Sequence, residues 1–220
     1  LAHYEHVSLA DEPAVLAALR GLSRHVRIDR VECLWEPYVV LAARVREHLG
    51  LPGMTVQQAL PYRDKELMKQ VLDAAGIRTP RHAAASSVHE VWEAAERIGY
   101  PLCIKPIAGA GSQDTYRVDS AQDLAEVLPA LKHIRTVSVE EFIDGEEFTY
   151  DTIGLDGEVL YENICWYLPR PLEARSHEWI SPMMVALRDT SGPEFDGGRQ
   201  MGLDVLKALG FGSGFSHMEW

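Results

Sequence analysis

The sequence predicts an α/β (α+β) protein, in which helices alternate with strands before a run of strands follows. One observation is the apolar stripe of residues 64–75, which has the period of about 3.6 that is typical of a helix. A second is the pair Ser87 and Glu90, which forms a capping box at the start of another helix. A third is the pair of Asp-Gly turns at residues 144–145 and 156–157, because each separates two strand-like stretches and signals a hairpin.

The remaining elements follow from apolar periodicity and from the glycines and prolines that interrupt it. Helices are expected at residues 13–24, 38–49, 64–75, 87–98, 120–131 and 193–209. Strands are expected at residues 26–33, after Pro80, and at 100–105, 113–118, 136–143, 146–155, 158–167 and 211–220. Residues 166–191 are expected to be irregular.

Composition limits the class of partner. The formal net charge of −12 over 220 residues argues against nucleic acid or an anionic membrane as the main partner, although a local cationic pocket could still hold a small anion. Cys33, Cys103 and Cys165 are widely spaced and form no C-x-x-C pair, so neither a disulfide framework nor a zinc site is predicted. No signal peptide or membrane-spanning apolar run is visible, so a reducing cytoplasm is the default expectation.

The strand that ends at Lys105 carries the first candidate binding group. Leu102 and Ile104 point to one face of such a strand, so Lys105 points to the other. A buried ammonium group is costly without an anionic partner. Gly109 and Gly111 follow, and they allow backbone N–H groups to approach a ligand closely. A point charge beside such N–H groups suits a polyphosphate; the alternative is an ordinary lysine at a strand end, followed by a flexible turn.

Four stretches, in the same order, resemble the ATP-grasp superfamily of carboxylate–amine ligases. The resemblance covers about residue 60 to the end, and the ordered set is more specific than any one stretch. The stretches are residues 63–69 with 75–80 (RDKELMK and AGIRTP), 100–112 (YPLCIKPIAGAGS), 139–149 (VEEFIDGEEFT) and 216–219 (SHME).

The resemblance implies the ATP-grasp fold, in which two lobes clasp a nucleotide. Residues 1–79 would be part of a Rossmann-like domain that precedes the grasp fold, together with a connecting helix. Residues 80–142 would form the smaller lid subdomain with the glycine-rich loop, and residues 143–220 the larger subdomain. The larger subdomain would be incomplete, and the chain is expected to be truncated at both ends.

The resemblance also implies how the nucleotide phosphates are bound. Lys65 and Lys105 would neutralise phosphate charge. Gly109, Gly111 and Ser112 would form a flap that closes over the β- and γ-phosphates. For Lys65 the alternative is a solvated lysine in the first turn of a helix.

The third stretch resembles the hinge between the lobes. In the family its backbone contacts the adenine edge, here near Glu140, Glu141 and Ile143. Glu147 would accept hydrogen bonds from the ribose hydroxyls. The alternative for this stretch is a partly solvated edge strand with two surface glutamates.

The last stretch implies a magnesium site, with Mn²⁺ as the alternative ion. Glu219 matches the first acidic ligand, because Mg²⁺ prefers carboxylate oxygens, and His217 could line the same cleft. His177 could approach the γ-phosphate or an acyl phosphate, with Arg175 as its competitor and an ordinary surface loop as the alternative. The remaining metal ligands and a substrate arginine are expected beyond Trp220.

The implied function is an ATP-dependent ligase that activates a carboxylate as an acyl phosphate and joins it to an amine. Glu36, residues 42–43 and 49–53 and the final HMEW resemble most the L-amino-acid ligase branch. The partners would be a small-molecule carboxylate and amine, and a homodimer through the preceding domain is a further expectation. Two alternatives stay open: a biotin-carboxylase-like or carbamoyl-phosphate-synthetase-like enzyme acting on bicarbonate, and a non-catalytic nucleotide-binding module.

Overall fold

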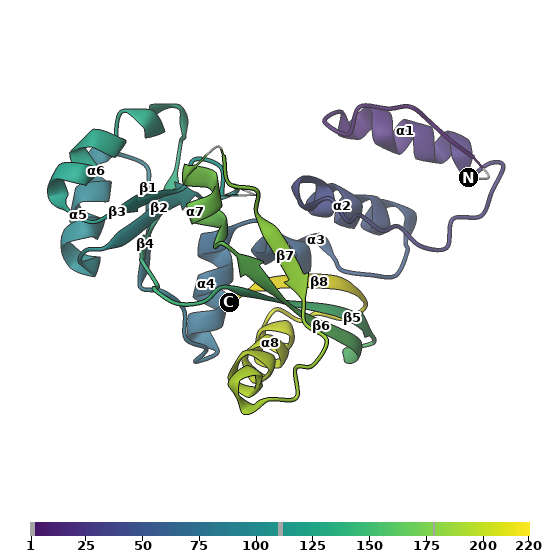
Figure 1. The fold of residues 1–220 in the computed structure, drawn as a ribbon. Coiled ribbons are helices and arrows are strands. Elements are labelled where there is room, and N and C mark those ends of the chain that lie inside the picture. The colour runs from purple at the N-terminus through teal and green to yellow at the C-terminus, as the bar shows by residue number, and fades with distance from the viewer. Residues whose placement is uncertain (1–2, 110–111, 178) are drawn as a thin grey trace.

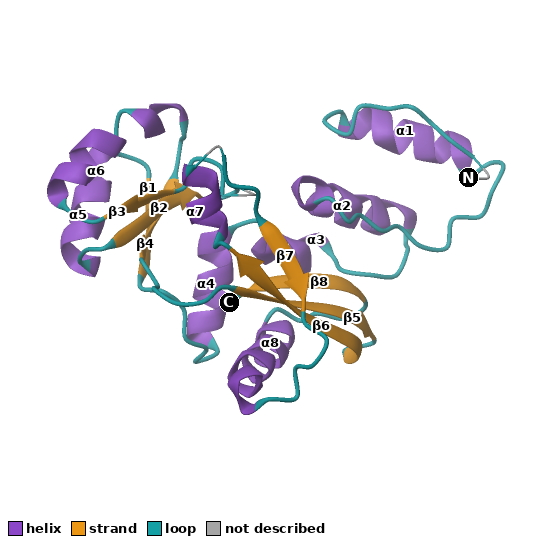
Figure 2. Ribbon diagram, viewed as in Figure 1, coloured by secondary structure: helices purple, strands orange, loops and turns teal. Residues whose placement is uncertain are grey.

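The computed structural model describes residues 3–109, 112–177 and 179–220 (Figure 1). Within these ranges the chain forms two four-stranded antiparallel sheets, preceded by a helical N-terminal part. Figure 2 shows the sheets side by side, with helices packed against each. No described helix is both long and apolar enough to cross a membrane.

The N-terminal part is helical. Its helices are α1 (Glu12–Leu22), α2 (Val39–Leu49), α3 (Val56–Ala59) and the connecting helix α4 (Lys65–Ala74), with short 3₁₀ helices at Glu36–Tyr38 and Leu60–Tyr62. The strand expected at residues 26–33 is wrong, because this segment pairs with no described strand. Instead the buried Arg46 guanidinium donates to the carbonyl of Val31 at 2.8 Å and to that of Met54 at 3.0 Å.

The first sheet contains β1 (His82–Ala85), β2 (Leu102–Pro106), β3 (Tyr116–Val118) and β4 (Val137–Glu141), in the order β1-β4-β2-β3. Leu102, Ile104 and Val139 are fully buried in its core, which also includes side chains of α5 (Val88–Ile98) and α6 (Ala121–Val127). Ser87 caps α5 by accepting from the Glu90 N–H, as expected. A 3₁₀ helix follows α6 at Ala130–His133.

The second sheet has the order β7-β6-β5-β8. Its strands are β5 (Phe148–Leu155), β6 (Glu158–Leu168), β7 (Met183–Ala186) and β8 (Gly214–Glu219). The 3₁₀ helix Pro193–Phe195 and α8 (Asp196–Ala208) follow β7 in the chain. Helix α8 packs closely on this sheet, because a Cβ at Gly202 would lie 2.3 Å from the ring of Tyr150 on β5.

The two Asp-Gly turns have different outcomes. Asp156 and Gly157 join β5 to β6 in a hairpin, with the φ values of 53° and 87° that its two central residues require. The hairpin expected at residues 144–145 is wrong, because these residues lead from the first sheet into the second. Both sides of β4 are already paired, by β1 and by β2, so β4 has no free edge to offer β5.

The stretch expected to be irregular, residues 166–191, contains α7 (Pro171–Ser176) and the edge strand β7. Pro171 occupies the first turn of α7, where its missing N–H costs no hydrogen bond. Strand β7 pairs with β6, and all four of its residues are exposed. The prediction failed here because the edge strand is set by a distant partner and not by a local pattern.

Helix α4 touches both halves of the molecule. Its Leu72 packs in an apolar cluster with Val205 and Leu209, which lie on α8 and at its C-terminal end. Its polar side meets β1 and β4 of the first sheet. The helix therefore fixes where its N-terminal residue, Lys65, stands relative to both sheets.

Candidate functional site

Lys105 stands on β2 as the sequence predicts. Leu102 and Ile104 are fully buried on one face, while Lys105 lies on the other and is partly exposed. Its ammonium forms an ion pair with Glu140 Oε2 at 2.8 Å. Burial works to lower the pKa of Lys105, but the Glu140 carboxylate outweighs it and the net pKa is raised. Lys105 therefore stays a cation.

Glu140 is the central anion of the site. Its side chain is 5% exposed and lies between two ammonium groups, with Oε1 at 2.5 Å from Lys69 and Oε2 at 2.8 Å from Lys105. Burial alone would raise the pKa of Glu140, but the charges of Lys105 and Lys69 lower it to about 2. The interpretation of this stretch as an exposed or edge strand is therefore wrong: β4 is an inner strand of the sheet and Glu140 is buried.

Lys65 is the first residue of α4. The helix is capped by Asp64, which accepts hydrogen bonds from the N–H groups of Glu66 and Leu67. The Lys65 ammonium donates to the carbonyl of Gly109 at 2.6 Å, so it contacts the start of the glycine-rich loop. Burial, with the nearby charge of Lys105, lowers the pKa of Lys65. An anionic ligand would offset the repulsion between the Lys65 and Lys105 ammonium groups.

The glycine-rich loop is held at its start by cations. The guanidinium of Arg63 donates to the carbonyl of Ala108 at 2.8 Å and forms an ion pair with Glu36. Gly111, expected in the phosphate flap, lies outside the described residues. Ser112 has a φ of 54°, a left-handed backbone that residues with a side chain rarely adopt.

The hinge residues diverge after Glu140. The Glu141 carboxylate turns to the other side of the strand, where it faces Arg78 at 3.3 Å and Arg81 at 3.5 Å. A hydrogen bond from the Arg81 N–H is the main cause of its lowered pKa. Ile143 is half exposed, after the end of β4. The Glu141 carboxylate is therefore held away from Lys105, and the Glu141 N–H donates to the carbonyl of Arg81 at 2.8 Å.

A cavity of about 580 Å³ opens at the hinge. It is lined by residues 144–146 of the hinge, by residues 166–170 at the end of β6, and by Glu173. Arg170 spans it and donates to Asp144 at 2.9 Å and to the carbonyl of Gly145 at 3.1 Å. The volume lies within the range of small-molecule sites.

The second sheet carries carboxylates near Lys65 and Lys105, and we call the space between these groups the cleft. Glu219 on β8 and Asp151 on β5 both approach the imidazole of His217, with Asp151 Oδ1 at 2.6 Å and Glu219 Oε1 at 3.8 Å. The hydrogen bond to Asp151, with the nearby carboxylate of Glu219, raises the pKa of His217 to about 10. The Tyr167 hydroxyl donates to Glu219 at 3.4 Å. The imidazole is therefore positively charged and shared between the two carboxylates.

Charged groups of the two sheets lie close enough to shift one another's pKa values. The neighbouring His217 is the largest cause of the lowered pKa of Glu219, and the charges of Lys105 and Lys65 add to it. Burial, with repulsion from Glu219, raises the pKa of Glu147. The structure therefore brings together Lys65, Lys105, Glu140, Glu147 and Glu219.

These carboxylates are hard oxygen ligands of the kind that Mg²⁺ prefers, and Glu219 and Glu147 could contribute to holding it. Among the described residues, no group of three or more His, Cys, Asp or Glu side chains is arranged as a complete metal site. A metal ion here would also need oxygens from a phosphate or from water, as is usual for Mg²⁺.

His177 lies apart from this group. It follows α7, is exposed, and its Nδ1 lies 3.1 Å from the carbonyl of Glu173. Its ring contacts Trp179 with the centroids 6.0 Å apart. The described contacts join His177 to its own loop and not to Lys105.

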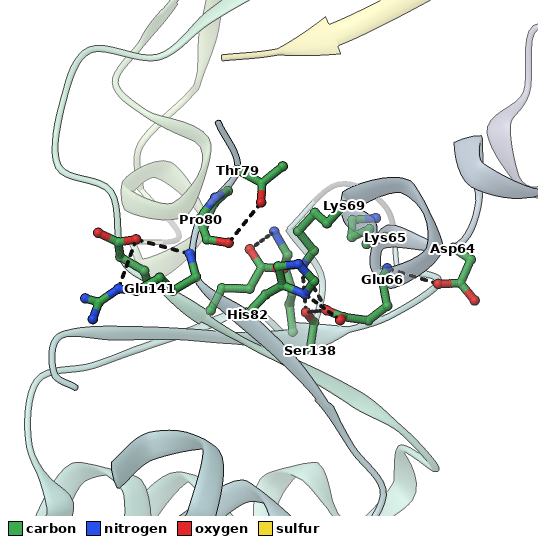
Figure 3. A network of polar contacts seen from close by, with 12 residues as sticks. Asp64, Lys65, Glu66, Lys69, Thr79, Pro80, His82, Ser138 and Glu141 are labelled. Atoms are coloured by element: carbon green, nitrogen blue, oxygen red, sulfur yellow. Dashed lines mark hydrogen bonds and ion pairs between the residues drawn. The ribbon is translucent and has the colours of Figure 1, made fainter. Parts of the chain in front are cut away.

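The sequence interpretation missed the residues beneath Lys105. Glu66 and Lys69 on α4 and Ser138 on β4 lie together (Figure 3), and Lys69 also donates to Glu140 to complete a buried cluster. A signal was available, because Glu66 and Lys69 are three residues apart on one helix and Lys69 shares a face with the buried Leu72. A charged pair on the apolar side of a helix indicates a buried partner elsewhere.

Two family models match separate parts of the chain. Residues 3–53 match the ATP-grasp N-terminal domain, and residues 64–147 match the ATP-binding domain of the carbamoyl-phosphate synthase L chain.

Individual relatives agree with these matches. The L-arginine-specific L-amino acid ligase of Bacillus subtilis is 26% identical over 174 residues, which is 74% of this chain and 42% of the relative. The D-alanine–D-alanine ligase of Clostridium perfringens (strain SM101 / Type A) is 40% identical over 120 residues, which is 53% of this chain and 39% of the relative.

A solved structure confirms the expected fold. The crystal structure of L-amino acid ligase from Bacillus licheniformis superposes with a TM-score of 0.77 at 24% identity, over 95% of this chain and 49% of that one. The chain thus spans less than half the length of each of these three proteins.

Proposed function

We propose, because the chain belongs to the ATP-grasp superfamily, that it is the nucleotide-binding part of an ATP-dependent ligase that joins a carboxylate to an amine. The observation that carries the proposal is the pairing of the two cleft walls. Lys65 and Lys105 come from different elements, and both act on Glu219 across the cleft. Cations facing carboxylates in this way suit a polyphosphate bound together with a divalent cation.

The reaction we propose has two steps. The substrate carboxylate attacks the γ-phosphate of ATP, forming an acyl phosphate and releasing ADP. The amine then attacks the acyl carbon, forming the amide and releasing inorganic phosphate. Each step transfers a group between reactants, so the protein contributes mainly by positioning them and stabilising charge.

The residues have distinct roles in this proposal. Lys65 and Lys105 neutralise phosphate oxygens, and the loop from Gly109 through Gly111 to Ser112 covers the phosphates. The loop would also exclude water from the acyl phosphate. Mg²⁺, or Mn²⁺ in its place, would neutralise phosphate charge at Glu219.

The hinge would bind the rest of the nucleotide. In this proposal the backbone near Glu140, Glu141 and Ile143 would contact adenine, and Glu147 would accept hydrogen bonds from the ribose hydroxyls. Recognition of the planar adenine ring by backbone groups needs no particular side chain. This agrees with the Glu141 carboxylate, which turns away to face Arg78 and Arg81. His177 remains a candidate for contact with the transferred phosphate only if its loop approaches the cleft.

The relatives narrow the substrate class. L-amino acid and D-alanine ligases both join amino acids, so we propose an amino-acid carboxylate and an amino-acid amine as substrates. A cytoplasmic location and a homodimer through the N-terminal part complete the proposal.

The test uses the full-length protein with ATP, Mg²⁺ and a panel of L- and D-amino acids, and measures phosphate release. We expect release that depends on particular amino acids, with a new amide detected by mass spectrometry. The variant Glu219→Gln is the matched control, and we expect it to lower the rate about 100-fold at fixed Mg²⁺. Release that depends on bicarbonate and not on amino acids would favour a carboxylase-like enzyme. Nucleotide binding without release under any of these conditions would favour a binding module.

A further inference from the structure

A buried charge network consists of Glu66, Lys69, Ser138 and Glu140, and its Glu140 forms the ion pair with Lys105. Figure 3 shows Glu66, Lys69 and Ser138 of this network. The Lys69 side chain is 3% exposed. Its ammonium lies 2.8 Å from Glu66 Oε1, 2.8 Å from Ser138 Oγ and 2.5 Å from Glu140 Oε1. A lysine ammonium has three hydrogens to donate, so these three acceptors satisfy it completely.

The network balances charge. Its two carboxylates, Glu66 and Glu140, face two ammonium groups, those of Lys69 and Lys105. Glu140 contacts each ammonium group with one of its two oxygens. Its negative charge is therefore shared between Lys69 and Lys105, and Lys105 does not have to neutralise it alone. Two opposite charges in contact cancel most of each other's field. A Lys105 that neutralised Glu140 by itself would attract an outside anion only weakly.

The network also joins the two elements that carry cleft lysines. Lys69 lies four residues after Lys65 on α4, whereas Glu140 on β4 contacts Lys105 on β2. The contact between Lys69 and Glu140 therefore fixes the position of α4 against the sheet, and with it the position of Lys65 relative to Lys105. Glu66 extends the anchorage, because its Oε2 lies 2.7 Å from His82 Nδ1 on β1.

We propose that Lys69 is a positioning residue for anion binding: it holds Glu140 in place and offsets its charge, so that Lys105 keeps a positive charge directed at phosphate oxygens. Lys69 itself does not touch the ligand, because its three hydrogens are already used within the network. This inference rests on the proposed function only in taking the anion to be a nucleotide phosphate.

A purely structural role would leave Lys69 important for folding alone, so the test separates stability from anion affinity. In Lys69→Met, two buried carboxylates lose their shared cation, and we expect both the melting temperature and the affinity to fall. In the double variant Glu66→Gln with Lys69→Met, one negative and one positive charge are removed together. The remaining pair of Glu140 and Lys105 is balanced, so we expect most of the melting temperature to return.

In the double variant the affinity for the anion should stay low even though the melting temperature recovers. In the double variant Glu140 is left to Lys105 alone, and we expect the dissociation constant for MgADP, measured by calorimetry on the full-length protein, to stay about tenfold above wild type. The single variant Glu66→Gln is the matched control, because it keeps Lys69 on Glu140, and we expect its affinity within about twofold of wild type. Wild-type affinity in the stable double variant would overturn the proposal, and so would an equal loss in Glu66→Gln.

Inorganic tripolyphosphate is the second probe, and it separates this inference from the proposed function. It offers the same phosphate oxygens without a nucleoside. If wild type binds tripolyphosphate but not MgADP, the nucleotide function fails while the same variants still decide the role of Lys69. If wild type binds neither probe, both proposals are overturned.

Discussion

The two walls of the cleft neutralise their charges in opposite ways. On the first sheet, Glu140 is paired with Lys105 through one carboxylate oxygen and with Lys69 through the other. On the second sheet, Glu219 and Asp151 share the imidazole of His217, while Glu147 is left facing Glu219. The first wall pairs its buried carboxylate with two ammonium groups and keeps net positive charge for an anion, whereas the second gains from a further cation. In the proposed function the first wall holds its shape, and the second would take up the metal ion.

Two glutamates show the contrast most clearly. Burial works to raise the pKa of both, but the two lysines beside Glu140 reverse the effect and lower its pKa to about 2. Glu147 has a carboxylate neighbour, Glu219, so its pKa stays raised. The same side chain is thus a fixed anion on one wall and a group under repulsion on the other.

The largest effect is expected for Glu140→Gln, which leaves two buried ammonium groups without their shared anion. We expect a loss of about 3–5 kcal/mol in the free energy of unfolding at pH 7, measured by urea denaturation. Because the folded pKa is about 2 and the ordinary value is 4.5, this contribution is complete above about pH 4.5 and lost as the pH falls toward 2. The gap between wild type and variant should therefore narrow between these pH values, and a gap that does not change with pH would contradict the assignment.

The next effect is expected for Lys105→Met, which removes a charge that faces the ligand. We expect the rate of amino-acid-dependent phosphate release to fall by about 100- to 1,000-fold. Glu140 keeps Lys69 in this variant, so the loss of stability should be smaller than in Glu140→Gln. Lys132→Met, which changes an exposed lysine on the same lobe, is the control for charge alone. Similar rates in the two variants would remove Lys105 from the site.

A smaller effect of opposite character is expected for Glu147→Gln on the second wall. Losing a carboxylate acceptor for the ribose hydroxyls should weaken ATP binding about tenfold, measured as KM or by calorimetry. Because the substitution also removes repulsion from Glu219, the melting temperature of the ligand-free protein should not fall. A large fall would mean that Glu147 supports the fold and not the ligand.

The smallest effect is expected behind the second sheet, where Arg199 on α8 donates to Glu162 at 2.6 Å and to the carbonyl of Thr190 at 3.0 Å. We expect Arg199→Gln to cost about 1 kcal/mol in unfolding free energy. The affinity of this variant for MgADP should be unchanged within error, because these contacts of Arg199 do not involve the cleft residues. A change in affinity would mean that charges behind both walls matter, and the contrast between the walls would not hold.

Local patterns predicted much of the fold. The side of β2 that carries Lys105, the caps of α4 and α5, and the hairpin at residues 156–157 each depend on residues that are close in sequence. Features decided by distant partners were not predictable in this way. The central position of β4 depends on pairing with both β1 and β2, and this pairing also turned the expected hairpin at residues 144–145 into the link between the sheets.

The residues of the candidate site also fall into those that a local motif names and those whose role depends on distant partners. Lys65, Lys105 and Glu219 belong to the motif stretches, so the sequence alone names them as candidates. Lys69 lies inside one of those motifs, but its importance depends on Ser138 and Glu140, which are about 70 residues away. The sequence of helix α4 shows that Lys69 is charged, but it does not show which distant side chains Lys69 contacts.

Helix α4 meets its two neighbours through contacts of different kinds. Toward the first sheet it is held by short ionic contacts, which lose their strength when the partners shift by an ångström or two. Toward α8 it rests on Leu72, Val205 and Leu209, and apolar contacts of this kind depend little on direction. Any relative movement of the two halves should therefore take place at the apolar side, where side chains can slide, while α4 travels with the first sheet as one piece. Lys65 and Lys105 would then move together, and the distance between their ammonium groups would stay the same.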